Sequence, residues 1–136
     1  MITSISLAQI FFTISSYSTI LPLIVAIYNR NKLNHPLKYL GYLVYFSACI
    51  EVISAVLWWQ ERNNLPLLHI LVVVEFILIG WMYQLYLHRL YNRYFIPIII
   101  LAFSIYSIIN SLFIQSIYTF NTYARPIGNI LFIFFA

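Results

Sequence analysis

The sequence predicts an all-α fold, a polytopic transmembrane helical bundle with four full spans, a partial fifth span and the N-terminus outside. Hydrophobic residues make up 63% of the 136 residues and charged residues only 7%, whereas soluble domains carry about 25% charged residues. Long apolar stretches alternate with short basic loops, which is typical of helical spans and unlike the short alternating segments of a β-barrel. We therefore expect a single transmembrane domain over residues 1–136.

The first expected span covers residues 7–28 and is retained in the mature chain. No basic residue precedes it and no small-residue cleavage site ends it, so it differs from a cleavable signal peptide. Pro22 removes one backbone hydrogen bond and should kink this helix. The loop that follows, residues 29–38, contains three Lys or Arg residues and Pro36, which together mark a break between spans.

A helical hairpin comes next, with expected spans over residues 39–60 and 65–87. Its turn is Glu61-Arg62-Asn63-Asn64, and a turn this short makes the two spans antiparallel neighbours. Pro66 suits the first turn of the second span, because the backbone N–H that proline lacks would have no partner there. We expect the rest of the bundle to be organised around this hairpin.

The last two apolar segments cover residues 95–117 and 127–136. The second segment has ten residues, which extend ~15 Å along a helix, about half of a ~30 Å hydrocarbon core. A free carboxylate at that depth would be costly. We therefore expect the partial fifth span to be re-entrant, or the sequence to be truncated at its C-terminus.

The distribution of basic residues predicts how the chain is threaded. Loops 29–38 and 88–94 together hold five Lys or Arg residues, and the other two loops hold two. Cytoplasmic loops carry the excess of positive charge, so we expect loops 29–38 and 88–94 to be cytoplasmic. Because the net charge of +4 is explained by this topology, the expected partner is the lipid bilayer and not a nucleic acid.

A glutamate lies inside each arm of the hairpin, at the same distance from the turn. Glu51 precedes Asn63 by 12 residues and Glu75 follows it by 12, which places both carboxyl groups ~15–18 Å from the turn, near the bilayer midplane. Two neighbouring carboxyl groups in an apolar site cannot both ionise easily, so the pair would hold one proton or bind a cation. The alternative is that each glutamate is protonated and joins two helices through a hydrogen bond.

A second group of polar residues is expected nearer the outer end of the spans. His69, Asn110 and Gln9 fall at similar depths and suggest a polar pocket that opens to the outside. The alternative for His69 is a neutral side chain that donates one hydrogen bond. Since paired histidines and Glu-x-x-His spacing are absent from the spans, we expect neither a metal site nor a cofactor.

The hairpin carries its polar residues in a recognisable pattern. Glu51 lies in the first arm, Asn-Asn-Leu-Pro-x-x-His follows from Asn63, and Glu75-Phe76 lies in the middle of the second arm. Over residues 38–90 this pattern resembles small uncharacterised multi-pass bacterial membrane proteins. The resemblance implies a protein of the bacterial inner (plasma) membrane and brings no activity with it.

Three functions remain open at this point. The first is a structural, sensor or assembly bundle in which Glu51 and Glu75 join helices and which has a partner membrane protein or a second copy. The second is a proton- or cation-coupled carrier of a small solute. The third is a lipid-active membrane enzyme in which His69 and a glutamate act as acid and base. We rank them in this order and assign no catalytic residue.

Overall fold

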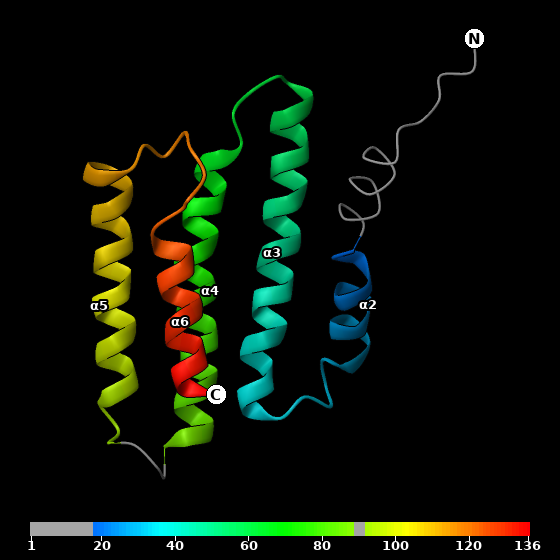
Figure 1. Ribbon diagram of the computed structural model, residues 1–136. Coiled ribbons are helices and arrows are strands. Elements are labelled where there is room, and N and C mark those ends of the chain that lie inside the picture. The colour runs from blue at the N-terminus through cyan, green and yellow to red at the C-terminus, as the bar shows by residue number, and fades with distance from the viewer. Residues whose placement is uncertain (1–17, 89–91) are drawn as a thin grey trace.

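Helices make up the whole of the regular structure in the part of the chain that the computed structural model describes, residues 18–88 and 92–136. This confirms the predicted all-α helical bundle (Figure 1). In chain order the elements are α2 (Ile20–Asn29), α3 (His35–Trp59), α4 (Leu65–Leu87), α5 (Phe95–Ile109), the π-helix η1 (Asn110–Ile114) and α6 (Ala124–Phe135).

Three helical segments among the described residues are long and apolar enough to cross a membrane: α3, α4, and α5 continued by η1. Their 25, 23 and 20 residues correspond to ~30–38 Å of helix, enough for a ~30 Å hydrocarbon core. This indicates a membrane protein. Much of the predicted span 7–28 lies outside the described residues. Its described part contains α2. The fourth full span and the outside N-terminus therefore stay predictions.

Prolines explain where the observed helices begin. The second arm of the hairpin is found as predicted, with α4 over Leu65–Leu87 and Pro66 in its first turn. The first arm begins at His35, four residues earlier than predicted, because Pro36 lies in the first turn of α3 and does not end the loop. Similarly, Pro126 lies in the first turn of α6, which begins at Ala124 and not at residue 127.

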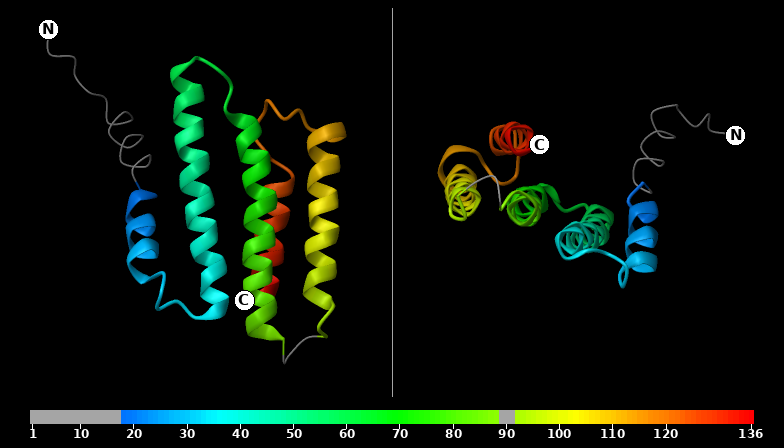
Figure 2. Two further views of the ribbon diagram at one scale, coloured as in Figure 1. Left: turned by 180° about the vertical axis from the view of Figure 1, so that it is seen from behind. Right: turned by 90° about the horizontal axis from the view of Figure 1, so that it is seen from below.

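The helices form a row with one helix on its face. α2, α3, α4 and α5 follow one another in the row, and α6 packs against α4 and α5 (Figures 1 and 2). The loop 115–123 descends from the end of η1 before α6 begins, so the 12 residues of α6 cover only part of the length of α4 (Figure 1). The predicted partial span is thus a half-length helix packed on one face of the row.

The hydrophobic core lies between α4, α5 and α6. Phe76 of α4 is 1% exposed, and its ring stacks on Phe103 and Phe132 with centroid distances of 3.9 and 4.9 Å. Two glycines allow the helices to approach. A Cβ atom at Gly80 would lie 2.7 Å from Ile100, and one at Gly128 would lie 3.1 Å from the ring of Phe103. Small residues at such crossings are typical of helices that pack in membranes.

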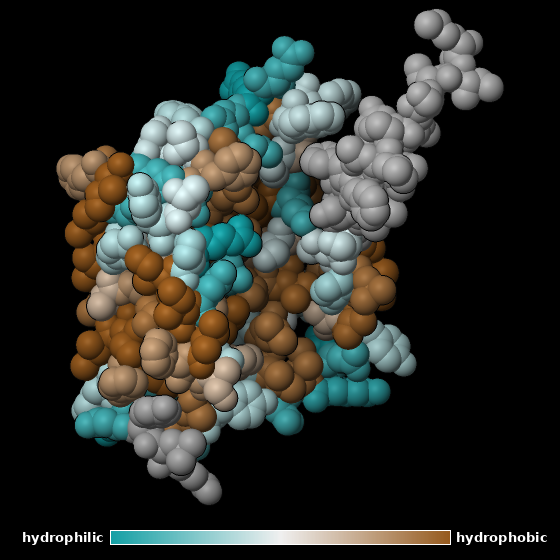
Figure 3. Space-filling view, in the orientation of Figure 1, coloured by the Kyte–Doolittle hydropathy of each residue, from teal (hydrophilic) through white to brown (hydrophobic). Residues whose placement is uncertain are grey.

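The outer surface is apolar along the helices. Figure 3 shows hydrophobic side chains over much of the middle of one face, with hydrophilic residues gathered at both ends. Large apolar residues of every helix are exposed, among them Leu21, Val52, Ile70, Leu101 and Ile133. Such a surface suits contact with lipid chains, because water would not solvate it.

Candidate functional site

His69 lies at the centre of a buried polar cluster at the end of the bundle where α4 begins. The side chain is 4% exposed. Its Nδ1 atom lies 2.8 Å from the hydroxyl oxygen of Ser111, and its Nε2 atom lies 3.0 Å from the backbone oxygen of Thr119. Because a carbonyl oxygen only accepts, Nε2 donates, and the neutral ring then accepts from Ser111 through Nδ1. His69 therefore joins α4 to η1 and to the loop 115–123.

Three further polar side chains are buried at the ends of α5 and of the loop. Ser107 and Asn110 are fully buried, and Asn121 is nearly so. Neither the Ser107 hydroxyl nor either amide atom of Asn110 has a hydrogen-bond partner among the described residues. Asn121 accepts a 3.0 Å hydrogen bond from the backbone N–H of Ala124 and so caps α6, while its Nδ2 atom lacks a described partner. Each unsatisfied buried group costs about 1–3 kcal/mol.

A π-helical turn distinguishes the end of α5 from the other helix ends. It covers Asn110–Ile114 and directly follows the regular part of the helix. π-Helical turns are rare and are frequent at functional sites. Here the turn carries Asn110 in the bundle interior and Ser111 against His69.

Glu75 lies in a different crevice, between α4, α5 and α6. Arg125 and Asn129 of α6 line the same crevice, together with the apolar side chains of Val72, Phe76, Phe103 and Phe132 and with Gly128. The open space has a volume of about 10 Å³, close to the minimum for one water molecule. Neither Glu75 nor Arg125 forms an ion pair or hydrogen bond within the described part of the chain. The crevice thus brings a carboxyl group and a guanidinium group together without pairing them.

Glu51 lies on the other side of the molecule. It is exposed, and its carboxylate accepts a 2.5 Å hydrogen bond from the hydroxyl of Thr19, just before α2. The structure therefore does not bring Glu51 and Glu75 to a common site: the first faces α2 and the second faces α6. The equal spacing of the two glutamates from the turn predicts their depth along the helices. It does not predict how each helix is rotated about its axis, and so it does not predict which neighbouring helix each carboxyl group faces.

Two of the three residues expected in the outer pocket, His69 and Asn110, belong to the described part of the chain. His69 and Asn110 lie at the same end of the bundle on neighbouring helices, and His69 contacts Ser111, the residue next to Asn110. Both are buried among the described residues, so a pocket open to the outside stays a prediction. Gln9 lies outside the described residues. No group of three or more His, Cys, Asp or Glu side chains suited to a metal is found within them.

One part of these sites is visible in the sequence and another was missed. Ser104, Ser107 and Ser111 form a polar stripe at a spacing of three and four residues, but this spacing does not indicate that His69 is the partner of Ser111. Arg125 was missed as a bundle residue, because it was counted among the loop residues. A proline in the second or third helical position indicates a helix start equally well, and that reading would have placed Arg125 in the bundle.

Comparisons with protein-family models, with curated proteins and with solved structures found no match to this chain. The described residues by themselves define the class, a helical bundle with three helices suited to crossing a membrane and with polar side chains buried at the junction of α4, α5 and α6.

Proposed function

We propose that this chain is a multi-pass membrane bundle with a structural, sensing or assembly role, in which buried polar side chains hold a half-length helix in place. The observation that carries the proposal is the double contact of His69 with Ser111 and with the backbone of Thr119. One buried side chain thereby fixes the positions of α4, η1 and the loop that leads to α6.

Other side chains hold the same loop. Asn63, at the turn between α3 and α4, donates a 3.1 Å hydrogen bond to the backbone oxygen of Tyr118. Gln115 donates to the backbone oxygen of Phe120 and, at 2.9 Å, to the hydroxyl of Thr122. Irregular backbone beside a hydrocarbon layer needs such partners, because lipid offers none. These polar groups are therefore engaged in holding the fold, which is the pattern of a structural bundle.

The space inside the bundle also favours a structural role. Sites for small organic ligands usually enclose about 300–1,000 Å³. The crevice beside Glu75 encloses about 10 Å³, which is far too small for an organic solute or a lipid headgroup. An enzyme or carrier that used this crevice would need a more open conformation.

The proposal includes a location and a partner. The excess of Lys and Arg in loops 29–38 and 88–94 supports a multi-pass protein of the bacterial inner membrane with these loops in the cytoplasm. A sensing or assembly role requires a partner membrane protein or a second copy of the chain. Glu51 supports this requirement, since it is an exposed carboxyl group beside the exposed apolar side chains of Val52 and Ile53, and its described partner is the hydroxyl of Thr19.

A proton- or cation-coupled carrier is the second candidate, and one observation favours it. α6 is a half-length helix that begins inside the bundle, with Arg125 in its first turn and Glu75 opposite. Discontinuous helices whose ends lie near ionisable groups form the ion and substrate sites of many transporters. In this candidate Glu75, and not a Glu51–Glu75 pair, carries the proton or the cation.

The two candidates are separated by one set of variants of the full chain reconstituted in liposomes. Under the structural proposal His69→Ala lowers the free energy of unfolding by about 1–3 kcal/mol, because two buried hydrogen bonds are lost. His88→Ala is the matched control: it removes an exposed histidine at the C-terminal end of α4, whose hydrogen bond among the described residues is to the backbone oxygen of Leu85. A proton or cation flux that Glu75→Gln abolishes would overturn the structural proposal in favour of the carrier.

A further inference from the structure

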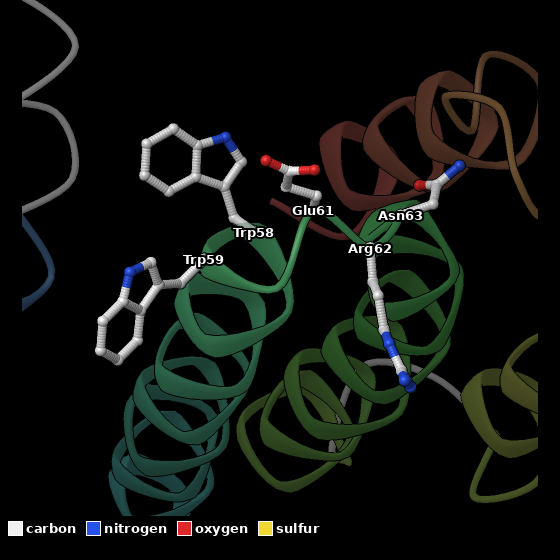
Figure 4. Close-up of a pocket in the computed structure, with 5 residues that line it drawn as sticks. All are labelled: Trp58, Trp59, Glu61, Arg62 and Asn63. Carbon is white, nitrogen blue, oxygen red and sulfur yellow. The ribbon is translucent and has the colours of Figure 1, made fainter.

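A wide groove lies at the turn that joins α3 to α4. We call it the hairpin groove; its walls are formed by Trp58, Trp59, Glu61, Arg62 and Asn63 (Figure 4). The open space has a volume of about 600 Å³, enough for a polar group of several atoms. Because α3 and α4 are both long enough to cross a membrane, their common turn lies at the level of the lipid headgroups.

The two tryptophans of the groove contribute little to the packing of the helices. Trp58 is 70% exposed and Trp59 is 85% exposed. Figure 4 shows both indoles extending away from the end of α3. Tryptophan is enriched at the membrane–water interface, and the face of an indole attracts ammonium groups. One wall of the groove therefore suits a cationic headgroup.

Opposite charges adjoin these aromatic rings. In Figure 4 the carboxylate of Glu61 lies on the side of the turn where Trp58 lies, and Arg62 extends from the other side. Both residues line the hairpin groove, and neither side chain forms an ion pair with another described residue. A carboxylate binds an ammonium group, and a guanidinium group binds the oxygens of a phosphate. Together they match a zwitterion that carries an ammonium group and a phosphate.

The backbone at Glu61 is unusual for a residue that carries a side chain. Glu61 has a φ of 56°, a left-handed conformation that usually requires glycine or asparagine. The backbone N–H of Arg62 bonds to the oxygen of Leu57, and that of Glu61 bonds to the oxygen of Trp58. This is the pattern in which a helix end commonly carries glycine at the position of Glu61. Strained residues of this kind are concentrated in ligand sites.

Asn63, at the α4 end of the turn, holds the backbone beside the groove in place. Its side-chain oxygen accepts a 2.8 Å hydrogen bond from the backbone N–H of Leu65, and its side-chain nitrogen donates to the backbone oxygen of Tyr118. Asn63 therefore fixes the start of α4 relative to the loop 115–123 and leaves Glu61 and Arg62 available.

We propose that the hairpin groove binds the headgroup of a zwitterionic phospholipid, with the ammonium group at Glu61 and Trp58 and the phosphate at Arg62. Phosphatidylethanolamine has this chemistry, and a headgroup of this kind is available at the depth where the groove lies. The proposal does not depend on whether the bundle is a structural protein or a carrier, since it uses none of the residues around His69 or Glu75.

The test is native mass spectrometry of the full chain in detergent, titrated with phosphatidylethanolamine and, separately, with phosphatidylglycerol. We expect the wild-type chain to bind phosphatidylethanolamine more tightly, and Glu61→Gln and Arg62→Gln each to weaken this binding roughly fivefold, as for one partly exposed charge contact. Arg30→Gln is the matched control: it removes an exposed basic residue from the loop 29–38, away from the groove, and should leave binding unchanged.

Glu61→Gly keeps the proposal falsifiable if a charge-removing variant folds poorly. Glycine relieves the left-handed backbone, so this variant should unfold at a higher temperature and yet bind phosphatidylethanolamine as weakly as Glu61→Gln. Wild-type affinity in Glu61→Gln and Arg62→Gln, or equal binding of the two lipids by the wild type, would overturn the proposal. Displacement of the lipid by phosphoethanolamine at equal concentration would overturn its assignment to a lipid.

Discussion

The two sides of α4 are built differently. On one side, α2 and α3 form a thin layer in which Glu51 and most large apolar side chains are exposed. On the other side, α5 and α6 enclose a core around Phe76 and bury His69, Ser107 and Asn110. Of an apolar 18-residue segment of α3, 11% of the residues are buried. The corresponding share is 22% in α4 and in α5 continued by η1. A polar residue is therefore enclosed where a third helix covers it, as α6 covers α4, and not merely because it lies midway along its helix.

The largest expected effect comes from opening the core on the covered side. Phe76→Ala should lower the free energy of unfolding by about 3–5 kcal/mol, because it removes a fully buried ring stacked on two others. Ile53→Ala on the exposed side is the control and should stay within about 0.5 kcal/mol of the wild type. Denaturant titration in mixed micelles measures both, and similar losses for the two variants would contradict the comparison.

A second pair of variants tests how closely the helices approach. Gly80→Ala should destabilise the protein by about 1–3 kcal/mol, since the added Cβ atom would lie 2.7 Å from Ile100. Gly41→Ala is the matched change in α3, where the nearest atom, in Leu33, lies at 3.4 Å. That variant should be neutral or stabilised by up to about 1 kcal/mol through helix propensity. Thermal unfolding in the same detergent compares them, and a stable Gly80→Ala variant would show that α4 and α5 are not in close contact.

The turn between the two sides offers a stabilising change. Glu61→Gly should raise the free energy of unfolding by about 1 kcal/mol, because glycine adopts a φ of 56° without steric cost. Glu61→Ala is the control, since alanine keeps the strain and removes the same carboxylate. If both variants gain stability equally, charge and not backbone strain is the cause.

The smallest expected effect concerns the two glutamates. Glu51→Gln and Glu75→Gln should change the free energy of unfolding additively, within about 0.5 kcal/mol, because the side chains face different helices and share no partner. A double-mutant cycle in lipid measures the coupling. A coupling above about 1 kcal/mol would mean that the two carboxyl groups share a site after all.

The helices could largely be predicted because local signals mark their ends. The short turn and the Pro66 that follows it indicated the start of α4. The long apolar stretches indicated α3, and α5 together with η1, to within a few residues. The site could not be predicted in the same way. The contact between His69 and Thr119 joins residues 50 positions apart through a loop, and the rotation that turns Glu75 toward α6 depends on packing around Phe76. No periodicity in the sequence encodes either.

The central claim is that buried polar contacts on the covered side hold α6 and its loop. A double-mutant cycle of His69→Ala and Ser111→Ala in lipid tests it most directly, because their side chains are 2.8 Å apart and lie on different helices. We predict a coupling of about 0.6–1.7 kcal/mol, the range found for hydrogen bonds between membrane helices. A coupling of zero, with each single variant as stable as the wild type, would contradict the account.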